Sequence, residues 1–430
     1  MKKKNIVSAC AFAAAFTCAA EFGVANVDVY QGNDSRQVRI SYDLKDVPAI
    51  ITVDVKTNGA SIGTANITHL SGDVNKIVTK TGQRCTAYWQ ADKSWPDHLI
   101  TDGSVTIDVV AWATNRPPDY CTVNLKNGDV CYYNAADQLP GGGVTNAIYK
   151  SDYLVMRYIA AAGVPWYMGS SNEKGRQSDR ETYQQVTLTN NYYISVYEFT
   201  QAQWQKFFAL PSGTYDKGDY RPIAYIKFGY LRESSDGTLN ASYDWPAAPN
   251  SASLLGQLRS LTGQQLAFDL PSEAQWEYAC RAGTTEGYWN DGSPILSSSG
   301  TDNNLNNLAR YAPTRSVGVY TGGSSSEATT AEVGTFNPNL WGLYDMHGNV
   351  REMCLDWYKN KYTYPDDTGT VCTDKSYTPY ANVPAHALRG GQAHTANCHL
   401  LRSAARSYIY MAQADGANKQ DGFRVVAVLP

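Results

Sequence analysis

Hydrophobic and polar residues alternate along the chain between Val27 and Leu125, and no other feature of the sequence restricts the fold as much. In QVRISYDL (Gln37–Leu44) every second residue is hydrophobic, and AIITVDVKTNG and VTIDVVAWAT repeat the pattern. Turn signals at Asn58-Gly59 and Asp102-Gly103 lie beside these segments. A period of two is typical of strands with one buried face, so the sequence predicts an all-β sandwich over residues 26–126.

About a hundred residues with short strands and regular turns suit an immunoglobulin-like arrangement of this sandwich. His69 and His98 stand alone in the sequence, and an isolated histidine is more often packed or solvated than a ligand. The segment contains no catalytic constellation. We therefore expect a spacer, docking or adhesion module.

The chain has 430 residues, which is long for one hydrophobic core. The stretch NAADQLPGGGVTN (Asn134–Asn146) is rich in residues that favour loops, and the alternating pattern ends before it. We predict a linker over residues 127–152 and a second domain over residues 153–430, giving an α+β protein in total.

The first residues predict a secretory signal peptide over residues 1–25. Three lysines precede the apolar run IVSACAFAAAFTCAA, and cleavage after Ala20 or Ala25 satisfies the small-residue rule. A membrane anchor is the alternative, but the run is shorter than the ~20 residues that span a bilayer. Cys18 leaves lipoprotein processing as a second alternative. We expect a secreted, periplasmic or cell-surface protein with no membrane span after cleavage.

Charge argues against nucleic acid as a partner. The formal net charge is −4, and the 36 lysines and arginines are scattered rather than gathered in a basic stripe. Of nine cysteines two lie in the signal peptide, so seven remain for up to three disulfides. Cys121 with Cys131 and Cys354 with Cys372 are the closest pairs in sequence, although spacing does not fix connectivity.

Two helix starts are marked in the second domain. Thr200 and Ser272 each precede a glutamine by three residues, which is the spacing of a capping box. Apolar residues such as Trp204 and Trp276 follow at helical spacing, and Gly283 is placed to end the second helix.

Five ordered segments of the second domain resemble the formylglycine-generating-enzyme, or sulfatase-modifying-factor, family. They include LPSEAQWEYACRAGTT (Leu270–Thr285), WGLYDMHGNVREMCLDWY (Trp341–Tyr358) and the closing segment from Leu388 to Val426. The resemblance implies a C-type-lectin-like fold with little regular structure, often stabilised by calcium. It places calcium at Asn349, Val350 and Glu352, whose oxygen donors suit that ion. The alternative is that Glu352 pairs with an arginine and Asn349 caps a turn.

Active members of this family are expected to oxidise a substrate cysteine with oxygen, using two cysteines five residues apart that bind copper. The resemblance aligns Cys398 with the second cysteine, but Ala393 takes the place of the first. His394 and His399 flank Cys398 and offer nitrogen ligands for a mixed site, although ordinary pocket polarity explains them as well.

Framework residues such as Arg389, Arg402, Arg406 and Arg424 match the family, whereas the residues between them do not. The predicted C-terminal binding pocket consists of Gln392, His394, His399, Tyr408, Tyr410 and Gln420. A domain that keeps the framework residues of the family but differs in the residues between them is also similar to the variable proteins of diversity-generating retroelements. Tyrosines suit such a surface, and core packing is the alternative for each of them.

The leading hypothesis is an exported protein that binds a protein, peptide or glycan ligand without catalysis. The alternative is an atypical formylglycine-generating oxidase that converts a sulfatase cysteine through Cys398, with copper as cofactor.

Overall fold

A computed structural model gives the structure of the protein. It describes residues 23–32, 35–45, 48–80, 82–98, 105–214, 216–288, 301–311, 329–360, 384–410 and 420–430. Residues 1–22 of the predicted signal peptide and the turn signal Asp102-Gly103 lie outside these ranges. The chain forms two compact units, the first built from residues 1–122 and 130–146 and the second from residues 123–129 and 147–428.

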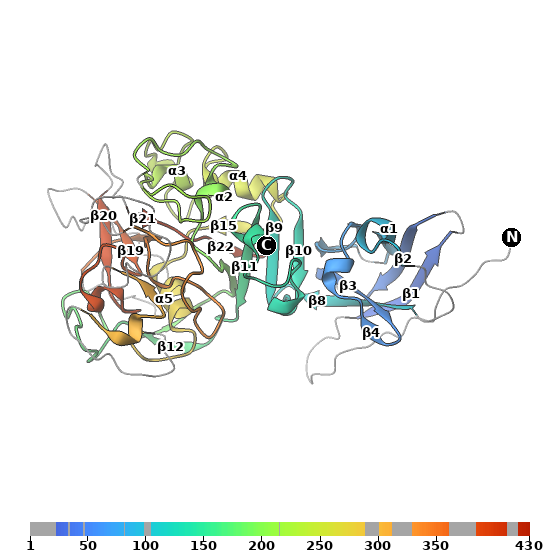
Figure 1. The fold of residues 1–430 in the computed structure, drawn as a ribbon, viewed down its shortest axis with the longest axis horizontal. Helices are drawn as coiled ribbons and strands as arrows, with labels where there is room; N and C mark the ends of the chain where they lie inside the picture. The colour runs from blue at the N-terminus through green and yellow to red at the C-terminus, as the bar shows by residue number, and fades with distance from the viewer. Residues whose placement is uncertain are drawn as a thin grey trace. The chain divides into compact units, whose positions relative to one another are not determined.

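The first unit is built almost entirely of strands (Figure 1). Its elements are β1 (Val24–Gln31), β2 (Gln37–Leu44), β3 (Ala49–Thr57), β4 (Ala60–Ser61), η1 (Thr64–Asn66), β5 (Leu70–Gly72), β6 (Ile77–Val78), β7 (Cys85–Gln90), α1 (Ala91–Ser94), β8 (Val105–Ala113), β9 (Tyr120–Asn124), β10 (Val130–Tyr133) and η2 (Ala136–Gln138). Residues 127–152, predicted as a linker, therefore contain β10 and η2 as well as the start of the second unit.

Two sheets of the first unit share one core. Strands β1, β2, β7 and β5 form one sheet in that order, and β3 pairs with β4, β6 and β8 in the other. Alternate residues from both sheets are buried together, among them Ile40 and Tyr42 of β2, Ile51 of β3 and Ile107 of β8. The three segments in which the sequence alternates are β2, β3 and β8, so the predicted strands are confirmed.

The second unit combines short strands with short helices and long loops. Its strands are β11 (Tyr153–Ile159), β12 (Pro165–Met168), β13 (Gln184–Thr187), β14 (Tyr192–Ser195), β15 (Ala267–Asp269), β16 (Ala309–Arg310), β17 (His347–Gly348), β18 (Arg351–Trp357), β19 (Ala385–Arg389), β20 (Ser407–Tyr410), β21 (Asp421–Gly422) and β22 (Val426–Val428). Its helices are η3 (Ala147–Lys150), α2 (Gln201–Trp204), α3 (Gly229–Arg232), η4 (Ala241–Tyr243), α4 (Leu254–Leu261), α5 (Glu273–Arg281), η5 (Asn303–Leu305) and η7 (Cys398–Leu401).

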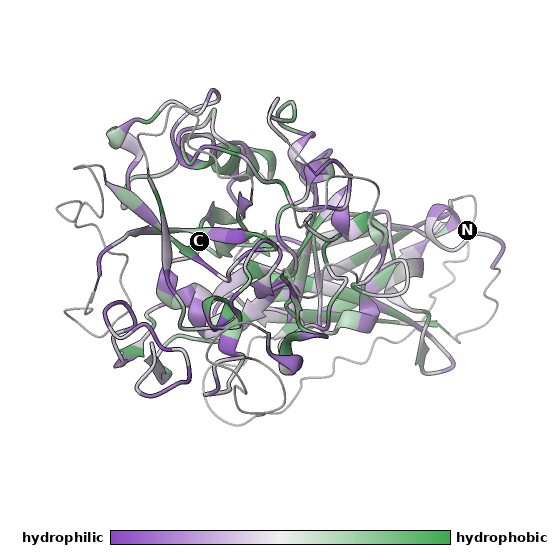
Figure 2. Ribbon diagram, turned by 60° about the vertical axis from the view of Figure 1, so that its left-hand side comes forward, coloured by the Kyte–Doolittle hydropathy of each residue, from purple (hydrophilic) through white to green (hydrophobic). Residues whose placement is uncertain are grey.

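Two sheets position the C-terminal part of the second unit, one of four strands and a larger one that includes β14, β22 and β15. Strands β20, β19, β18 and β21 lie side by side in that order, with β18 antiparallel to β19 and parallel to β21. The last strand, β22, pairs with both β14 and β15, so the end of the chain is tied to its middle. Figure 2 shows hydrophobic residues in the strands and helices and hydrophilic residues along many connecting loops.

Both predicted helix starts are confirmed. The side chains of Thr200 and Ser272 accept hydrogen bonds from the backbone N–H groups of Gln203 and Gln275, and each glutamine side chain accepts from the cap in return. The first helix ends after one turn at Trp204. The second ends at Arg281, and the left-handed conformation that closes it falls on Ala282, one residue before Gly283.

All helices in the described residues of the second unit are short, and the longest, α5, has nine residues. In the part of the chain that the structure describes, no helix is long and apolar enough to cross a membrane. Cys121 and Cys131, which are close in sequence, are free thiols in this structure, as is Cys354. Cys372, the cysteine nearest to Cys354 in sequence, lies outside the described residues.

Candidate functional site

Cys398, the predicted catalytic cysteine, lies at the start of η7 and is completely buried. It belongs to a hydrophobic cluster with residues such as Tyr288, Leu308 and Leu401. The Tyr288 hydroxyl donates a hydrogen bond to the Cys398 carbonyl oxygen at 2.9 Å. The surroundings of this cysteine are those of a core position rather than of an accessible nucleophile.

Ala393, which stands where the family has its first cysteine, is also fully buried. Its backbone N–H donates to the Asn349 carbonyl at 2.9 Å. The preceding residue, Gln392, is half-buried, and its backbone N–H donates to the Thr395 hydroxyl at 3.3 Å. The methyl group of Ala393 cannot bind copper, so this position contributes no ligand.

The polar residues around Cys398 differ in their exposure. His394 is exposed and His399 is half-buried, whereas Gln420 is buried. The backbone N–H of His394 donates to the Gln420 side-chain oxygen at 2.9 Å, so the structure brings these two predicted pocket residues together. The amide of Gln420 thus supports the backbone of the loop.

The two predicted surface tyrosines lie on β20. Tyr408 pairs with Ala387 across the sheet, is half-buried, and packs with its ring 4.8 Å from that of Tyr358. Tyr410 pairs with Ala385 through its backbone. For Tyr408 these contacts favour core packing over an exposed binding role.

The predicted calcium residues already have protein partners. The Glu352 carboxylate accepts from Trp276 Nε1 at 2.6 Å and from Arg424 Nε and Nη2 at 2.6 and 2.7 Å. The Asn349 side-chain oxygen accepts from the Ala331 N–H at 2.8 Å. These oxygens do not fit a calcium site, because arginine, indole and amide donors surround them where the ion would need free lone pairs.

Asn349 and the backbone N–H of Val350 instead donate hydrogen bonds to a buried acid, Glu198. The Asn349 amide donates to Glu198 Oε2 at 2.5 Å, and the Val350 N–H donates to Glu198 Oε1 at 3.0 Å. Asn349 has a φ of 61°, a left-handed conformation that asparagine tolerates better than most residues. The side chain therefore holds a turn, which is the alternative that the sequence left open.

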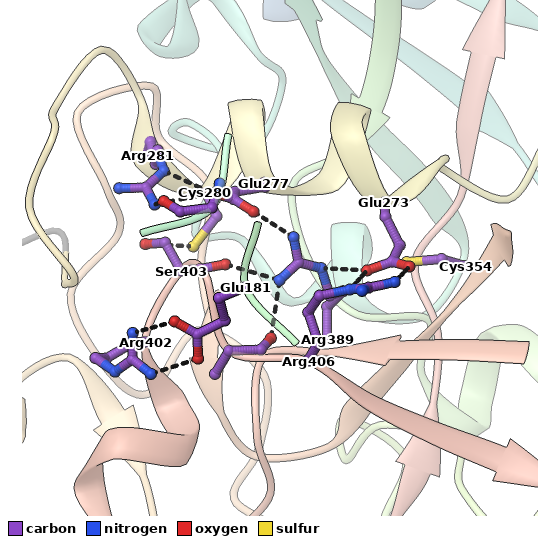
Figure 3. Close-up of polar contacts among 12 residues, drawn as sticks. Glu181, Glu273, Glu277, Cys280, Arg281, Cys354, Arg389, Arg402, Ser403 and Arg406 are labelled. Atoms are coloured by element: carbon purple, nitrogen blue, oxygen red, sulfur yellow. Dashed lines mark hydrogen bonds and ion pairs between the residues drawn. The ribbon is translucent and has the colours of Figure 1, made fainter. Parts of the chain in front are cut away.

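The matched arginines of the framework form a buried network of ion pairs around α5 (Figure 3). Glu277 binds both Arg281, at 2.9 Å from Nε, and Arg389. Glu273, one turn earlier, binds Arg406 at 2.7 and 2.5 Å. Burial alone would raise the pKa of Glu277, but the two arginines outweigh it and hold that pKa below its ordinary value. These arginines therefore have a structural role, because they hold their segments against α5 through buried ion pairs.

Arg402 extends the network to the first loops of the second unit. It binds Glu181 through both ends of its guanidinium group, at 2.5 and 2.8 Å, and Glu173 at 2.8 Å. None of the four acids of the network was predicted from the sequence; they are Glu173, Glu181, Glu273 and Glu277. Glu273, Glu277 and Arg281 repeat every four residues on a marked helix, and this spacing was the available signal.

A second cysteine, Cys280 of α5, lies beside the network. Its Sγ is 3.4 Å from the Ser403 hydroxyl and 4.0 Å from His347 Nε2. Burial raises the pKa of Cys280 to about 12 and lowers that of His347 to about 4, so both stay neutral. The described residues contain no group of three or more His, Cys, Asp or Glu side chains that could hold a metal ion.

A cavity of about 640 Å³ lies elsewhere in the second unit, and none of the six predicted pocket residues lines it. Its wall is formed by β12, the loop that follows β12, Tyr183, and the end of α5 with the loop after it. Gly169, in the wall, has a φ of 79°, and a Cβ there would come within 2.0 Å of the Thr182 carbonyl oxygen. Glycine is thus required where the chain turns along the cavity.

Known proteins resemble this chain mainly over its second unit. The family model described as "Sulfatase-modifying factor enzyme 1-like domain" matches residues 155–429. The formylglycine-generating enzyme of Mycobacterium tuberculosis is 35% identical over 166 residues, which cover 37% of this chain and 50% of the enzyme. The corresponding mouse (Mus musculus) enzyme is 24% identical over 62% of this chain and 73% of its own length.

Other relatives carry different names. The "Chaperone protein LppX" of Paenibacillus barcinonensis is 26% identical over 48% of this chain and 77% of that protein. Among solved structures, PvdO from Pseudomonas aeruginosa overlaps 64% of this chain and 95% of its own, at 21% identity and a TM-score of 0.46. The chain spans about half the length of the mycobacterial enzyme.

Proposed function

The chain belongs to the sulfatase-modifying factor enzyme 1-like family, whose model matches more than half of it, and from this premise we propose an exported ligand-binding protein that does not oxidise cysteine. The proposal places ligand binding in the second unit. Fold membership alone does not carry catalysis, because activity resides in particular residues.

The observation that carries the proposal is the pair Ala393 and Cys398. Both residues are completely buried, and one of them has no thiol. A copper site with two thiolates needs two cysteines, and the expected first position offers a methyl group instead. The remaining thiol is completely buried in a hydrophobic cluster, so its surroundings are those of a core residue and not of a group that a substrate contacts.

Export and the finer fold details are part of the same proposal. The cationic start and the apolar run before residue 26 support a secreted, periplasmic or cell-surface protein. The two sheets with one shared core support an immunoglobulin-like sandwich in the first unit, which we propose as a docking or spacer module. We propose a C-type-lectin-like arrangement for the second unit, in line with the family.

One observation favours an atypical formylglycine-generating oxidase as a second candidate. The mycobacterial relative, which is 35% identical over 166 residues, is named a formylglycine-generating enzyme. In this candidate Cys398 would be the catalytic thiol, and copper would need His394 or His399 as further ligands. The exposure of His394 beside a fully buried Cys398 gives this set little support.

An aldehyde assay tests the proposal. The purified full chain would be incubated with a sulfatase-motif peptide, copper and a reductant, beside the mycobacterial enzyme as a positive control. We expect no formylglycine by mass spectrometry. Aldehyde formation by the wild type that disappears in Cys398→Ser would overturn the proposal and establish the oxidase. Aldehyde that persists in Cys398→Ser would also overturn it, and would remove Cys398 from the mechanism.

A further inference from the structure

The cavity beside β12 has an aromatic wall, which consists of Trp166, Tyr167, Tyr183 and Tyr278. The rings of Tyr167 and Tyr183 are stacked, with centroids 4.8 Å apart and an angle of 8° between their planes. These tyrosines remain 51% and 48% exposed, so the stack gains little from burial within the protein. Each ring covers one face of the other, so an outer ring face of the pair is left for a ligand.

A hydrogen-bond donor in the same wall lacks an acceptor. The Nε1 atom of Trp166 is buried and has no hydrogen-bond partner among the residues that the structure describes. A buried indole N–H without an acceptor costs about 1–3 kcal/mol. Trp166 packs its ring 5.2 Å from that of Tyr278, which fixes the indole in the wall. Nε1 has almost no accessible surface, so a ligand in the cavity reaches this donor only if the indole turns.

Charges along the cavity balance each other. The lining contains two acids, Glu173 and Glu286, and two bases, Lys174 and Arg281. Arg281 lies 3.5 Å from Glu173 and also binds Glu277, so its charge is compensated inside the protein. A charged ligand would find no surplus of opposite charge to offset the loss of its hydration. The lining therefore favours a neutral ligand.

Small polar groups complete the lining. Ser171, Asn172, Thr284 and Thr285 supply hydroxyl and amide groups that both donate and accept hydrogen bonds. A mixture of one apolar face and several such groups matches a molecule with a flat C–H face and many hydroxyls. Sugars have this chemistry, whereas an aliphatic peptide side chain or a lipid tail lacks the hydroxyl groups.

We propose that this cavity binds a neutral saccharide unit, which stacks on the outer face of the Tyr167–Tyr183 pair and forms hydrogen bonds with the hydroxyl and amide groups of the lining. The volume of about 640 Å³ is in the range of ordinary ligand sites. The inference deepens the proposed binding function and rests on it. It moves the ligand site from the C-terminal loop to the wall between β12 and the end of α5.

The test is binding of the full chain to an array of immobilised neutral oligosaccharides with glucose, galactose, mannose or N-acetylglucosamine at their ends. Sialylated counterparts, choline and a trimethyl-lysine peptide serve as charged probes. We expect retention by at least one neutral class. Retention by no neutral class, or preference for a charged probe, overturns the proposal. The aldehyde assay is independent, so a failure here leaves the absence of catalysis standing.

Variants locate the binding. The double variant Tyr167→Ala/Tyr183→Ala should weaken it about tenfold or more, since about 1.4 kcal/mol corresponds to tenfold. Tyr167→Phe/Tyr183→Phe keeps both rings and should bind nearly as well. The matched control is Tyr30→Ala in the first unit, because Tyr30 is 46% exposed and lies outside the cavity.

Circular dichroism confirms that each variant is folded. Unchanged binding by a folded Tyr167→Ala/Tyr183→Ala variant overturns the site. An equal loss in Tyr30→Ala does so too, because the effect would then not be specific to the cavity.

Discussion

The two units of the protein differ in the kinds of residue that fill their interiors. In the first unit, alternate residues of two sheets fill an apolar core, and Asp73 is the one buried charged residue among the residues described there. In the second unit, arginines and acids such as Arg389, Arg402 and Glu277 are completely or almost completely buried. A regular sheet satisfies its own backbone groups, whereas long loops need side chains to fasten them.

The difference has an energetic side. An apolar core loses stability in proportion to the contacts and the cavity that a substitution creates. A buried ion pair adds little net stability when intact, but removing one partner leaves an uncompensated charge. We therefore expect the second unit to tolerate losses of charge less well than the first unit tolerates losses of volume.

The largest effect is expected from Glu277→Gln. This change keeps the side-chain shape but leaves Arg389 and Arg281 without their shared carboxylate, at a cost of about 3–5 kcal/mol. Hydrogen exchange followed by mass spectrometry reports each unit separately, and protection should fall in the second unit alone. Glu332→Gln, at an exposed position, is the matched control and should change stability by less than about 0.5 kcal/mol. A loss below 1 kcal/mol for Glu277→Gln would contradict the comparison.

A somewhat smaller loss is expected from Ile51→Ala in the first unit. Ile51 is completely buried in the shared core, and removing its three carbons should cost about 3 kcal/mol. Ile51→Val removes one carbon and should cost about 0.5–1.5 kcal/mol. The same exchange experiment measures both, with loss confined to the first unit. Equal effects of the two variants would show that packing does not set the stability there.

The smallest effect concerns pH. Burial lowers the pKa of His347 to about 4, so the unfolded chain takes up a proton first as the pH falls below its ordinary value of 6.5. The stability that neutral His347 provides is present above pH 6.5 and is lost between pH 6.5 and 4. At pH 5 the loss is about 2 kcal/mol. Between pH 8 and pH 5, urea unfolding should show wild type losing about this much relative to His347→Gln, and a constant difference would exclude this role.

The sequence predicted the parts of the molecule that follow local rules. The strands β2, β3 and β8 came from alternation, and the starts of α2 and α5 came from capping boxes. In each case neighbours within a few residues determine the outcome. The family assignment came from the resemblance and not from a local rule, and the framework arginines were recognised through the same resemblance.

The candidate site was not predictable in the same way. Tyr167 and Tyr183 are sixteen positions apart and stack only because β12 and β13 pair. Arg402 and Glu181 are 221 positions apart. No periodicity connects such residues, so no pattern in the sequence favoured the β12 cavity over the C-terminal loop.

The charged face of α5 restricts which amino-acid substitutions this protein can accept during evolution. Glu273, Glu277 and Arg281 fasten segments from distant parts of the chain to a single helix. Replacing Glu277 alone leaves Arg389 with Glu273 as its acidic partner among the described residues, and replacing Arg389 alone leaves Glu277 with Arg281. Substitutions at these positions are therefore coupled through the shared charges, whereas the loops between the anchors can vary in sequence one residue at a time.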